Sequence, residues 1–406
     1  MSRSDAEGRD FPMRYPRLNL LAGQDRRLRA GHPWVFSNEL QMDAAAKALP
    51  PGDIVCLFTA DGRPLALAQF NPHSRIAARV ASRNKDAVID ARFLERRLAR
   101  ALRLRAKLYE QPYYRLVHAE ADGLPGLVVD RFADVVVCQL NSAGMARLEE
   151  PLLEALQSVL APRAVVLRND SPVRELEGLA LEVRMARGEI DGPIELVEND
   201  LTYLADPLGG QKTGWYYDQR DNRAFAAQLA RGGRVLDLYS YSGGFAVAAA
   251  AAGAKEVLAV DRSQSGLELA LASAERNGVG GVLKTQREDG FAALDALAAD
   301  KQRFDLVIAD PPAFVRSKRE LKPGLRGYRK LARACGVLVA EGGFLAIACC
   351  SHNVPAEAFG DEVHRGLRDA GRGARLLRQS GAGPDHPGHP ALPESGYLKC
   401  LFCALD

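Results

Sequence analysis

Five short apolar runs in the second half of the chain limit the possible folds more than any other feature. The runs are VLDLY (235–239), EVLAVD (256–261), GVLKTQ (281–286), FDLVIAD (304–310) and GFLAIACC (343–350). Helices are predicted in the gaps, at 244–252, 264–277, 288–299 and 326–340. Strands and helices that alternate at this spacing are typical of a parallel sheet covered on both faces. Residues 191–406 are therefore predicted to form a doubly wound, Rossmann-like α/β domain, with ligands beyond the carboxyl ends of its strands.

The first half of the chain has a different pattern, which indicates two further domains. With 406 residues, the chain exceeds the usual size of a single domain. Residues 1–14 are polar and predicted to be frayed, whereas 18–82 read as short strands separated by turns. This predicts a small β-rich domain within residues 1–85. Residues 91–109 place apolar side chains at helical spacing between arginines, and strand-like segments and a helix at 145–160 follow, so an α+β central domain is predicted at 86–190.

The distribution of charge is more informative than the total. The formal net charge of +3 predicts no partner by itself, but basic residues gather in the first third of the chain. They include Arg26, Arg27, Arg29, Arg75, Arg79 and Arg83, followed by eight arginines and lysines between 92 and 115. A surface that faces a polyanion such as RNA is one interpretation. A solvated helix face is the other, and it fits any single cluster equally well.

The cysteines indicate a reducing compartment. There are seven of them, and the sequence has neither a signal peptide nor an apolar run long enough to span a membrane. Reduced thiols and a cytoplasmic location are expected. Cys400 and Cys403 form one C-x2-C pair without two further ligands, so they are interpreted as core residues of a terminal strand and no metal is predicted.

A glycine-containing turn and a series of acidic residues point to an adenosine ligand. Ser242, Gly243 and Gly244 stand between the first predicted strand and its helix, where a backbone can approach a ligand closely. The pattern is not G-x-G-x-x-G, so a nicotinamide cofactor is not favoured. Asp261 ends the second strand, where it can accept both ribose hydroxyls, and Asp289 follows the third, near a bound adenine amino group. The alternative is that these acids only face solvent in loops.

Two further strand ends carry candidate catalytic groups. The fourth strand ends in Asp310-Pro311-Pro312-Ala313-Phe314, a stiff turn that can hold a carboxylate against the ring-nitrogen edge of a base while Phe314 stacks on an unpaired base. The fifth strand ends in Cys349-Cys350, which brings a thiol near Asp310 at the same edge of the sheet. An ordinary proline turn and buried core cysteines are the structural alternatives.

Together these residues suggest methyl transfer to a pyrimidine carbon. Such a carbon is a weak nucleophile, but a thiolate that adds to the adjacent ring carbon converts the ring into an enamine, which can attack a methyl sulfonium. A free thiol has a pKa of about 8.5, so the site must lower this pKa or supply a base.

With these residues in place, the chain resembles the bacterial 23S rRNA 5-methylcytosine methyltransferases with an N-terminal PUA domain, of the large-subunit methyltransferase I type. The resemblance extends over nearly the whole chain. Its most specific segment is GQKTGWYYDQRDNR (210–223), and it also includes LNLLAGQDRRLRAGHPWVFSNEL, EADGLPGLVVDRF, RNDSPVRELEGL, DPPAF, CCSHNV and DHPGHPALPESGYLK.

The resemblance implies a role for each candidate residue. S-adenosylmethionine would lie over Tyr239, Ser242, Gly243 and Gly244, with Asp261 on the ribose, Asp289 at the adenine, and Gln219 and Arg220 in a cofactor-side motif. Cys350 would be the nucleophile and Asp310 would hold and protonate the cytosine ring. Many RNA 5-methylcytosine enzymes carry a second cysteine where this chain has Pro312, so product release needs another base. The choice between cytosine and uracil stays open.

The resemblance also implies ribosomal RNA as the partner, gripped by a PUA domain with Arg26, Arg27, Arg29 and His32 near phosphates. These contacts would position the RNA without reading its sequence. A homodimer is possible. Two rival functions remain: a methyltransferase that acts on a nitrogen, with Cys350 as inert packing, and a non-catalytic RNA-binding assembly factor. The sequence does not identify the modified nucleotide, or whether the substrate is free rRNA or an assembled particle.

Overall fold

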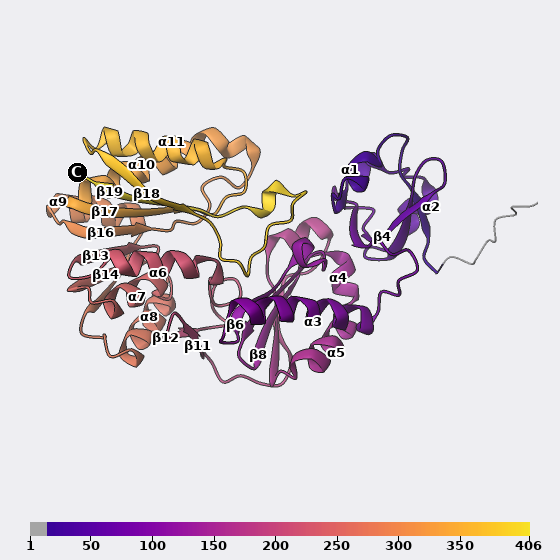
Figure 1. Cartoon of the computed structure of the whole chain (residues 1–406), viewed down its shortest axis with the longest axis horizontal. Helices are drawn as coiled ribbons and strands as arrows, with labels where there is room; N and C mark the ends of the chain where they lie inside the picture. The colour runs from indigo at the N-terminus through magenta and orange to yellow at the C-terminus, as the bar shows by residue number, and fades with distance from the viewer. Residues whose placement is uncertain (1–13) are drawn as a thin grey trace, which may run out of the picture.

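The computed structural model describes residues 14–406, and in this range the chain forms four β-sheets (Figure 1). Fraying was predicted for residues 1–14, and residues 1–13 lie outside the described range. Figure 1 shows an N-terminal, a central and a C-terminal part, one after the other along the length of the molecule. Among the described residues, none of the helices combines the length and hydropathy that a bilayer crossing requires.

The N-terminal part is built on a five-stranded sheet with the order β1-β3-β4-β5-β2. Its elements are β1 (Arg17–Asn19), α1 (Arg26–Arg29), β2 (Trp34–Val35), the 3-10 helix η1 (Ser37–Glu39), α2 (Ala44–Ala48), β3 (Ile54–Phe58), β4 (Pro64–Phe70) and β5 (Ala78–Ser82). Gly62, in the turn between β3 and β4, has φ +82°, a left-handed conformation that glycine adopts without steric cost. A small β-rich unit therefore stands where the strand and turn signals predict one.

The central part packs two long helices against a second five-stranded sheet, with the order β10-β9-β8-β7-β6. Its elements are α3 (Ala91–Leu108), β6 (Tyr113–His118), η2 (Ala119–Asp122), β7 (Leu127–Phe132), β8 (Val135–Leu140), α4 (Ala143–Arg147), α5 (Glu149–Leu160), β9 (Ala164–Asn169), η3 (Pro172–Glu177) and β10 (Glu182–Arg187). Helix α3 buries Phe93, Leu94 and Leu98, three of the six apolar side chains whose helical spacing predicted it, whereas Leu104 and Leu108 are exposed.

The prediction of a single helix at 145–160 was wrong in one respect, because the segment forms two helices, α4 and α5. Pro151 lies in the first turn of α5 and has no N–H group to donate to the carbonyl of Arg147. A continuous helix would leave that carbonyl without its bond, so the chain breaks at Leu148.

A two-stranded hairpin, β11 (Ile194–Glu198) and β12 (Leu201–Ala205), joins the central part to the C-terminal part. The hairpin packs on the C-terminal part through hydrogen bonds from the Leu204 N–H to Ser273 Oγ (3.0 Å) and from the Thr202 N–H to Asn277 Oδ1 (3.1 Å). One apolar core runs from the central sheet through the hairpin to the first helices of the C-terminal part. The two larger parts are therefore fixed to each other by continuous packing.

The C-terminal part contains a seven-stranded sheet with the order β15-β14-β13-β16-β17-β19-β18. Its elements are η4 (Tyr217–Gln219), α6 (Arg220–Leu229), β13 (Arg234–Leu238), α7 (Gly244–Ala251), β14 (Glu256–Asp261), α8 (Gln264–Arg276), β15 (Leu283–Arg287), α9 (Gly290–Ala299), β16 (Phe304–Ala309), η5 (Lys318–Glu320), α10 (Leu321–Leu338), β17 (Val339–Cys349), α11 (Ala356–Asp369), β18 (Ala374–Ser380), η6 (Pro393–Ser395) and β19 (Lys399–Leu405). Helix α10 begins at Leu321 rather than at 326, because Pro323 falls in its first turn, where proline is tolerated.

The strand arrangement confirms the predicted Rossmann-like fold. The first five strands in the sheet order are parallel, and β19 runs antiparallel to both β17 and β18. Helices α6, α7 and α8 pack on one face, and α9, α10 and α11 pack on the other (Figure 1). The sequence order of the strands reverses at β13, which lies between β14 and β16. Ligand sites in such sheets lie at this switch point, beyond the carboxyl ends of the strands.

Candidate functional site: a cavity at the strand ends

The turn that follows β13 has a strained backbone. Tyr239 and Tyr241 have φ values of +62° and +48°, which side-chain-bearing residues rarely adopt and which concentrate at functional sites. Gly243 has φ +77°, and a Cβ there would lie 2.5 Å from the Cβ of Ala270, so only glycine fits. Buried Asp237 fixes the turn, because its carboxylate accepts hydrogen bonds from the Ser240 hydroxyl (2.8 Å) and the Ala246 N–H (3.0 Å).

Asp261, at the end of β14, ties this turn to the next strand. Its two carboxylate oxygens accept hydrogen bonds from the backbone N–H groups of Tyr241 (2.9 Å) and Ser263 (2.7 Å). The carboxylate is therefore held in one orientation at the switch point of the sheet. Because each oxygen has a further lone pair, Asp261 can still accept hydrogen bonds from a ligand.

A cavity of about 500 Å³ opens at these strand ends. It brings together nine of the residues that the sequence singled out: Gln219, Tyr239, Ser242, Gly244, Asp261, Asp310, Pro311, Pro312 and Cys350. They come from four strand ends and from η4, so parts of the chain that are more than 100 residues apart converge on one space. The volume is within the roughly 300–1,000 Å³ of typical small-molecule sites.

The two adjacent cysteines face opposite sides of the sheet, as successive residues of a strand do. Cys349 is fully buried in the apolar core formed with α10 and α11. Cys350 is partly exposed and lines the cavity, and its thiol donates to the carbonyl oxygen of Pro311 across 3.8 Å. Of this pair, Cys350 therefore has the accessible sulfur.

Asp310 and Cys350 both have perturbed proton affinities. Burial, together with the negative charge of Asp218, raises the pKa of Asp310 to about 6, although a hydrogen bond from Gln219 Nε2 (2.9 Å) partly opposes this rise. Burial and the nearby Asp310 carboxylate raise the pKa of the Cys350 thiol to about 11. Near neutral pH the cavity therefore holds a neutral thiol beside a carboxyl group that can still gain or lose its proton.

Four other sequence-predicted residues of the C-terminal part do not line the cavity. Arg220 turns toward the central part, where its guanidinium donates to the carbonyl of Tyr113 and lies 4.3 Å from the centre of the Tyr109 ring. The Phe314 ring packs on Tyr328, with 4.7 Å between ring centres. Gly243 shapes the turn from behind, as described above.

Asp289 is the fourth of these residues, and it caps a helix. Its Oδ1 accepts a hydrogen bond from the Phe291 N–H (3.0 Å) at the start of α9. The residues on either side, Glu288 and Gly290, line the cavity, whereas the Asp289 side chain is exposed. A contact between Asp289 and adenine remains a prediction.

The four candidate RNA contacts of the N-terminal part lie apart from the cavity, and one of them, Arg27, forms an ion pair with Glu39 at 3.1 Å. Arg26 and Arg29 are exposed on α1, where Arg29 forms an ion pair with Asp25 at 2.5 Å. His32 is half-buried, with its Nδ1 3.0 Å from the Trp34 carbonyl oxygen. Burial and the charge of Arg27 lower the pKa of His32. The two arginines are accessible to a ligand on this surface.

Sequence reasoning missed five residues that form the wall of the cavity facing the central part: Lys212, Trp215, Tyr216, Asp218 and Tyr397. Tyr397 donates its hydroxyl proton to Asp218 Oδ2 at 2.5 Å, across a separation of 179 residues in the sequence. The signal that could have found them is the family likeness of two segments, GQKTGWYYDQRDNR and ESGYLK, which contain all five.

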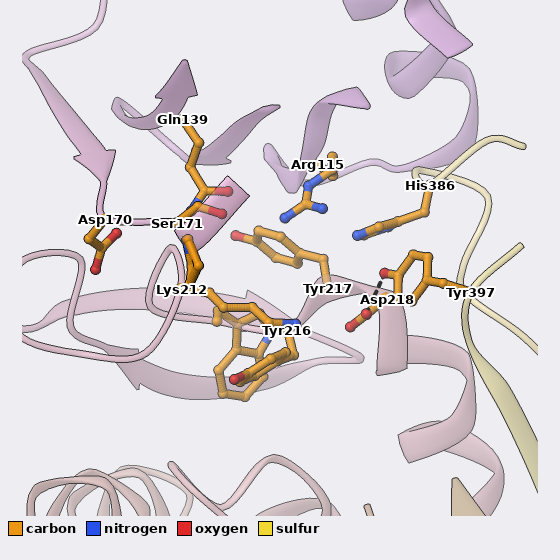
Figure 2. A pocket seen from close by; sticks show the side chains of 12 residues that line it. Arg115, Gln139, Asp170, Ser171, Lys212, Tyr216, Tyr217, Asp218, His386 and Tyr397 are labelled. Atoms are coloured by element: carbon orange, nitrogen blue, oxygen red, sulfur yellow. Dashed lines mark hydrogen bonds between the residues drawn. The ribbon is translucent and has the colours of Figure 1, made fainter. Parts of the chain in front are cut away.

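These same five residues also line a second cavity, of about 410 Å³, on the side of the central part. Figure 2 shows its other walls, which include Arg115 and Gln139 from the central sheet and His386 from the C-terminal segment. We call the first space the cofactor cavity and the second the junction cavity. They are separated only by the wall that runs from Lys212 to Asp218, with Tyr397 beside it.

The residues that line the cofactor cavity suit an adenosine-bearing ligand. Two glycines in its wall let aromatic rings pack directly on the backbone. A Cβ on Gly290 would lie 2.6 Å from the Tyr239 ring, and one on Gly244 would lie 3.2 Å from the Trp215 ring. Helix α7 begins at Gly244 and offers N–H groups there, while Asp261 offers carboxylate oxygens. Donors and acceptors for both ends of such a ligand are thus present.

Comparison with known proteins identifies the class of this chain. A family model described as S-adenosylmethionine-dependent methyltransferase matches residues 178–388, and a model described as PUA-like domain matches 18–83. The solved structure of SMU.776 complexed with SAH superimposes with a TM-score of 0.82 at 20% identity, covering 96% of this chain and 100% of that one. A protein from Streptococcus mutans gives 0.80, also at 20% identity and with the same coverage. The chain is an S-adenosylmethionine-dependent methyltransferase.

Closer relatives define the family. Ribosomal RNA large subunit methyltransferase I from Pseudoalteromonas atlantica is 36% identical over 397 residues, which are 96% of this chain and 99% of the relative. The protein of the same name from Yersinia pseudotuberculosis is 38% identical over 395 residues, with the same coverage. The chain belongs to the ribosomal RNA large subunit methyltransferase I family, and this confirms the resemblance found in the sequence.

Proposed function

We propose that this protein methylates carbon 5 of a cytosine in the RNA of the large ribosomal subunit, through a covalent adduct with Cys350. The names of its relatives support the RNA substrate. The observation that carries the chemistry is that Cys350, Asp310 and the strained turn after β13 line one cavity. A base bound in this cavity would have the proposed nucleophile, the proposed acid and the cofactor turn around it.

S-adenosylmethionine supplies an electrophilic methyl group when it is bound. The turn at Tyr239, Ser242 and Gly244 would hold it, with Asp261 accepting from the ribose hydroxyls. Asp289 and Arg220 are included in this proposal because of the family motif, although they do not line the cavity. Gln219 would hold Asp310 in place, through the hydrogen bond from its Nε2 to Asp310 Oδ2 (2.9 Å).

The residues of the chain would act in two steps. In the first, the Cys350 thiol gives its proton to the Asp310 carboxylate, and the resulting thiolate adds to carbon 6 of the cytosine. Asp310 passes that proton to nitrogen 3, so that carbon 5 becomes an enamine carbon and takes the methyl group from the sulfonium, which is left as a neutral thioether. In the second, the carbon 5 proton leaves, nitrogen 3 returns its proton to Asp310, and the sulfur–carbon bond breaks to release Cys350. Pro312 carries no thiol, so a group other than a second cysteine accepts the carbon 5 proton.

Binding of the RNA is assigned to the N-terminal part and to the rigid turn. Arg26, Arg29 and His32 belong to a domain within residues 1–85 and would contact phosphates of the RNA. Such contacts position the RNA without reading its sequence. The target base must leave its stack to reach Cys350. Pro311 and Pro312 would form one wall of its pocket, and Phe314 would support that wall from behind through Tyr328. The central domain (86–190) and the methyltransferase domain (191–406) would enclose the target between them.

The test is covalent trapping on large-subunit rRNA transcribed with 5-fluorocytidine, because fluorine at carbon 5 blocks the release step. Wild-type protein and the Cys349→Ala variant should give a band that survives denaturing electrophoresis, whereas Cys350→Ala should give none. Nucleoside mass spectrometry of normal rRNA after the reaction should show 5-methylcytidine. A methylated nitrogen without an adduct would support the rival nitrogen methyltransferase, and 5-methyluridine would move the target to uracil. Failure to bind S-adenosylmethionine in calorimetry would support the assembly factor.

A further inference from the structure

The junction cavity has no role in the chemistry just described, yet it shares a wall with the site of that chemistry. It is built from three separate segments: the central part, the wall from Lys212 to Asp218, and the C-terminal segment with His386 and Tyr397. Figure 2 shows these segments around one space, with polar side chains directed into it. Its volume of about 410 Å³ is similar to that of the cofactor cavity.

The strongest sign of a ligand is an unused acceptor atom on Asp218. This side chain is 6% exposed and lines both cavities. Its Oδ2 accepts the Tyr397 hydroxyl at 2.5 Å, but its Oδ1 has no hydrogen-bond partner among the described residues. Burial by itself would raise the pKa of Asp218, but the nearby His386 and Lys212 and the Tyr397 bond outweigh this effect and hold the pKa at about 2. At neutral pH a buried carboxylate oxygen is therefore left unsatisfied, which is costly unless a ligand donates to it.

The other walls offer contacts that suit a nucleotide. Tyr216 is partly exposed and provides aromatic surface beside the buried rings of Trp215 and Tyr217. The side chains of Gln139 and Ser171 make no hydrogen bond within residues 14–406. Lys212 is exposed and lies 4.5 Å from the centre of the Tyr216 ring, and it forms no salt bridge in the described part of the chain. Aromatic surface, amide and hydroxyl groups and a free ammonium are the usual means of holding a single-stranded nucleotide.

We propose that the junction cavity binds the base of the RNA nucleotide next to the target cytosine, and that Asp218 Oδ1 accepts a hydrogen bond from an amino group of that base. This inference rests on the proposed function, because it assumes that the target base occupies the adjoining cavity. The cavity offers a base the unpartnered acceptor of Asp218, whereas the ammonium of Lys212 is exposed, so the base enters while its phosphate stays near Lys212. Guanine, adenine and cytosine carry an amino group on the Watson–Crick edge. Uracil instead presents two carbonyl oxygens beside its N3–H, and these would repel the carboxylate.

The experiment compares flanking-base preference in the wild-type protein and in Asp218→Asn. Mass spectrometry first locates the methylated cytosine in large-subunit rRNA, and hairpin RNAs are then made with both neighbours of that cytosine randomised. Sequencing of the methylated fraction gives a relative kcat/KM for each flanking base. At one of the two positions, wild-type protein should use uracil about tenfold less well than the amino-bearing bases, as expected for one lost base contact.

Asp218→Asn should reverse this preference. The asparagine carbonyl can still accept the Tyr397 hydroxyl, and its NH₂ group then replaces Oδ1 as a donor that suits uracil O4 and not an amino group. A change that only damaged the fold would lower kcat/KM for all four bases equally and leave their ratio unchanged, and that result would overturn the proposal. So would equal use of all four bases by the wild-type protein at both positions. In either case, continued formation of 5-methylcytidine would leave the proposed function standing.

A second variant covers the case in which Asp218→Asn does not fold. Gln139 lines the junction cavity and not the cofactor cavity. Gln139→Phe should fill part of the space and raise KM for the hairpin about tenfold. The affinity for S-adenosylhomocysteine, measured by calorimetry, should stay unchanged and shows that the protein is folded. An unchanged KM in a protein that binds S-adenosylhomocysteine normally would count against a bound base at this site.

Discussion

Buried charges are treated differently in the central part and at the strand ends of the C-terminal part. In the central part, two arginines each form a two-point ion pair with a buried carboxylate. Arg105 is fully buried and contacts both carboxylate oxygens of Asp122 at 2.6 and 2.8 Å. Arg115 does the same with Asp130, with both distances 2.8 Å. Such two-point contacts are strong and hold one geometry, so these pairs act as a framework.

At the strand ends, the buried acids have no cationic partner among the described residues, and their proton affinities shift as a result. Burial raises the pKa of Asp237 to about 7, although hydrogen bonds to its carboxylate oppose this. Asp310 has a pKa of about 6 and Cys350 of about 11, for the reasons given above. Unpaired groups in a cavity are the ones whose proton occupancy can change during a reaction. The comparison suggests that paired charges maintain this structure, whereas unpaired charges carry out its chemistry.

The largest expected effect separates the two adjacent cysteines. Cys350→Ala should lower kcat/KM for rRNA methylation by on the order of 10⁴-fold or more, because it removes the proposed nucleophile. Cys349→Ala should retain most of the activity and cost about 1 kcal/mol of stability, since that side chain only fills the core. Both are measured by transfer of a radioactive methyl group and by thermal unfolding. Equal losses of activity in the two variants, at equal stability, would be incompatible with a sulfur nucleophile at Cys350.

The next effect concerns the framework. Arg105→Met leaves the Asp122 carboxylate buried without its partner, so the free energy of unfolding should fall by about 3–5 kcal/mol. The double variant Arg105→Met, Asp122→Leu should recover part of this loss, because no charge is then left buried. Urea unfolding measures both. At a temperature where each variant is folded, S-adenosylmethionine affinity should be unchanged, and a lost affinity would show that the framework and the site are not separable.

The third effect tests the unpaired carboxyl group. Asp310→Asn should lower kcat/KM by about 10²–10³-fold at neutral pH, as expected for loss of a general acid. The proposed reaction needs one proton on the pair formed by Asp310 and Cys350. Below pH 6 both groups are protonated, so wild-type kcat/KM should rise about tenfold per pH unit up to about 6 and then stay flat below 11.

In Asp310→Asn only the thiol titrates, so kcat/KM should keep rising with pH above 6 and show no plateau near neutrality. The pH profile is recorded with short RNA between pH 5 and 9. A wild-type profile that also rises steadily from pH 7 to 9 would rule out Asp310 as the proton donor.

Sequence patterns predicted the strand ends well and the cavity walls poorly. The sequence signals around Asp261, Asp310 and Cys350 are local, because about ten consecutive residues are enough to recognise a strand followed by a turn. Parallel packing then brings their carboxyl ends together. Alternation along β17 explains why Cys350, and not Cys349, faces the cavity, but the sequence could not show which face of the sheet that would be.

The wall residues depend on contacts between distant segments, and no local pattern encodes them. Tyr397 meets Asp218 only after the C-terminal segment has folded back over η4. Arg220 follows directly after Gln219 but points to Tyr109 in another part of the molecule, because consecutive residues on a helix project in different directions. Such outcomes are decided by tertiary packing, and the family resemblance indicated the segments but not the orientation of their side chains.

The smallest expected effect concerns Asp289, an exposed carboxylate that forms no ion pair with residues 14–406 and caps the start of helix α9. Asp289→Ala should lower stability by about 1 kcal/mol, because the N–H of Phe291 loses its acceptor. Asp289→Asn keeps an acceptor oxygen at the same position and should cost much less. Calorimetry with S-adenosylmethionine then separates the two possible roles. A role as helix cap alone predicts equal cofactor affinity in wild-type protein and Asp289→Asn, whereas the adenine contact expected from the family motif predicts weaker binding in the variant. Weaker binding in Asp289→Asn would show that the cofactor site extends beyond the present cavity wall and includes an exposed acid.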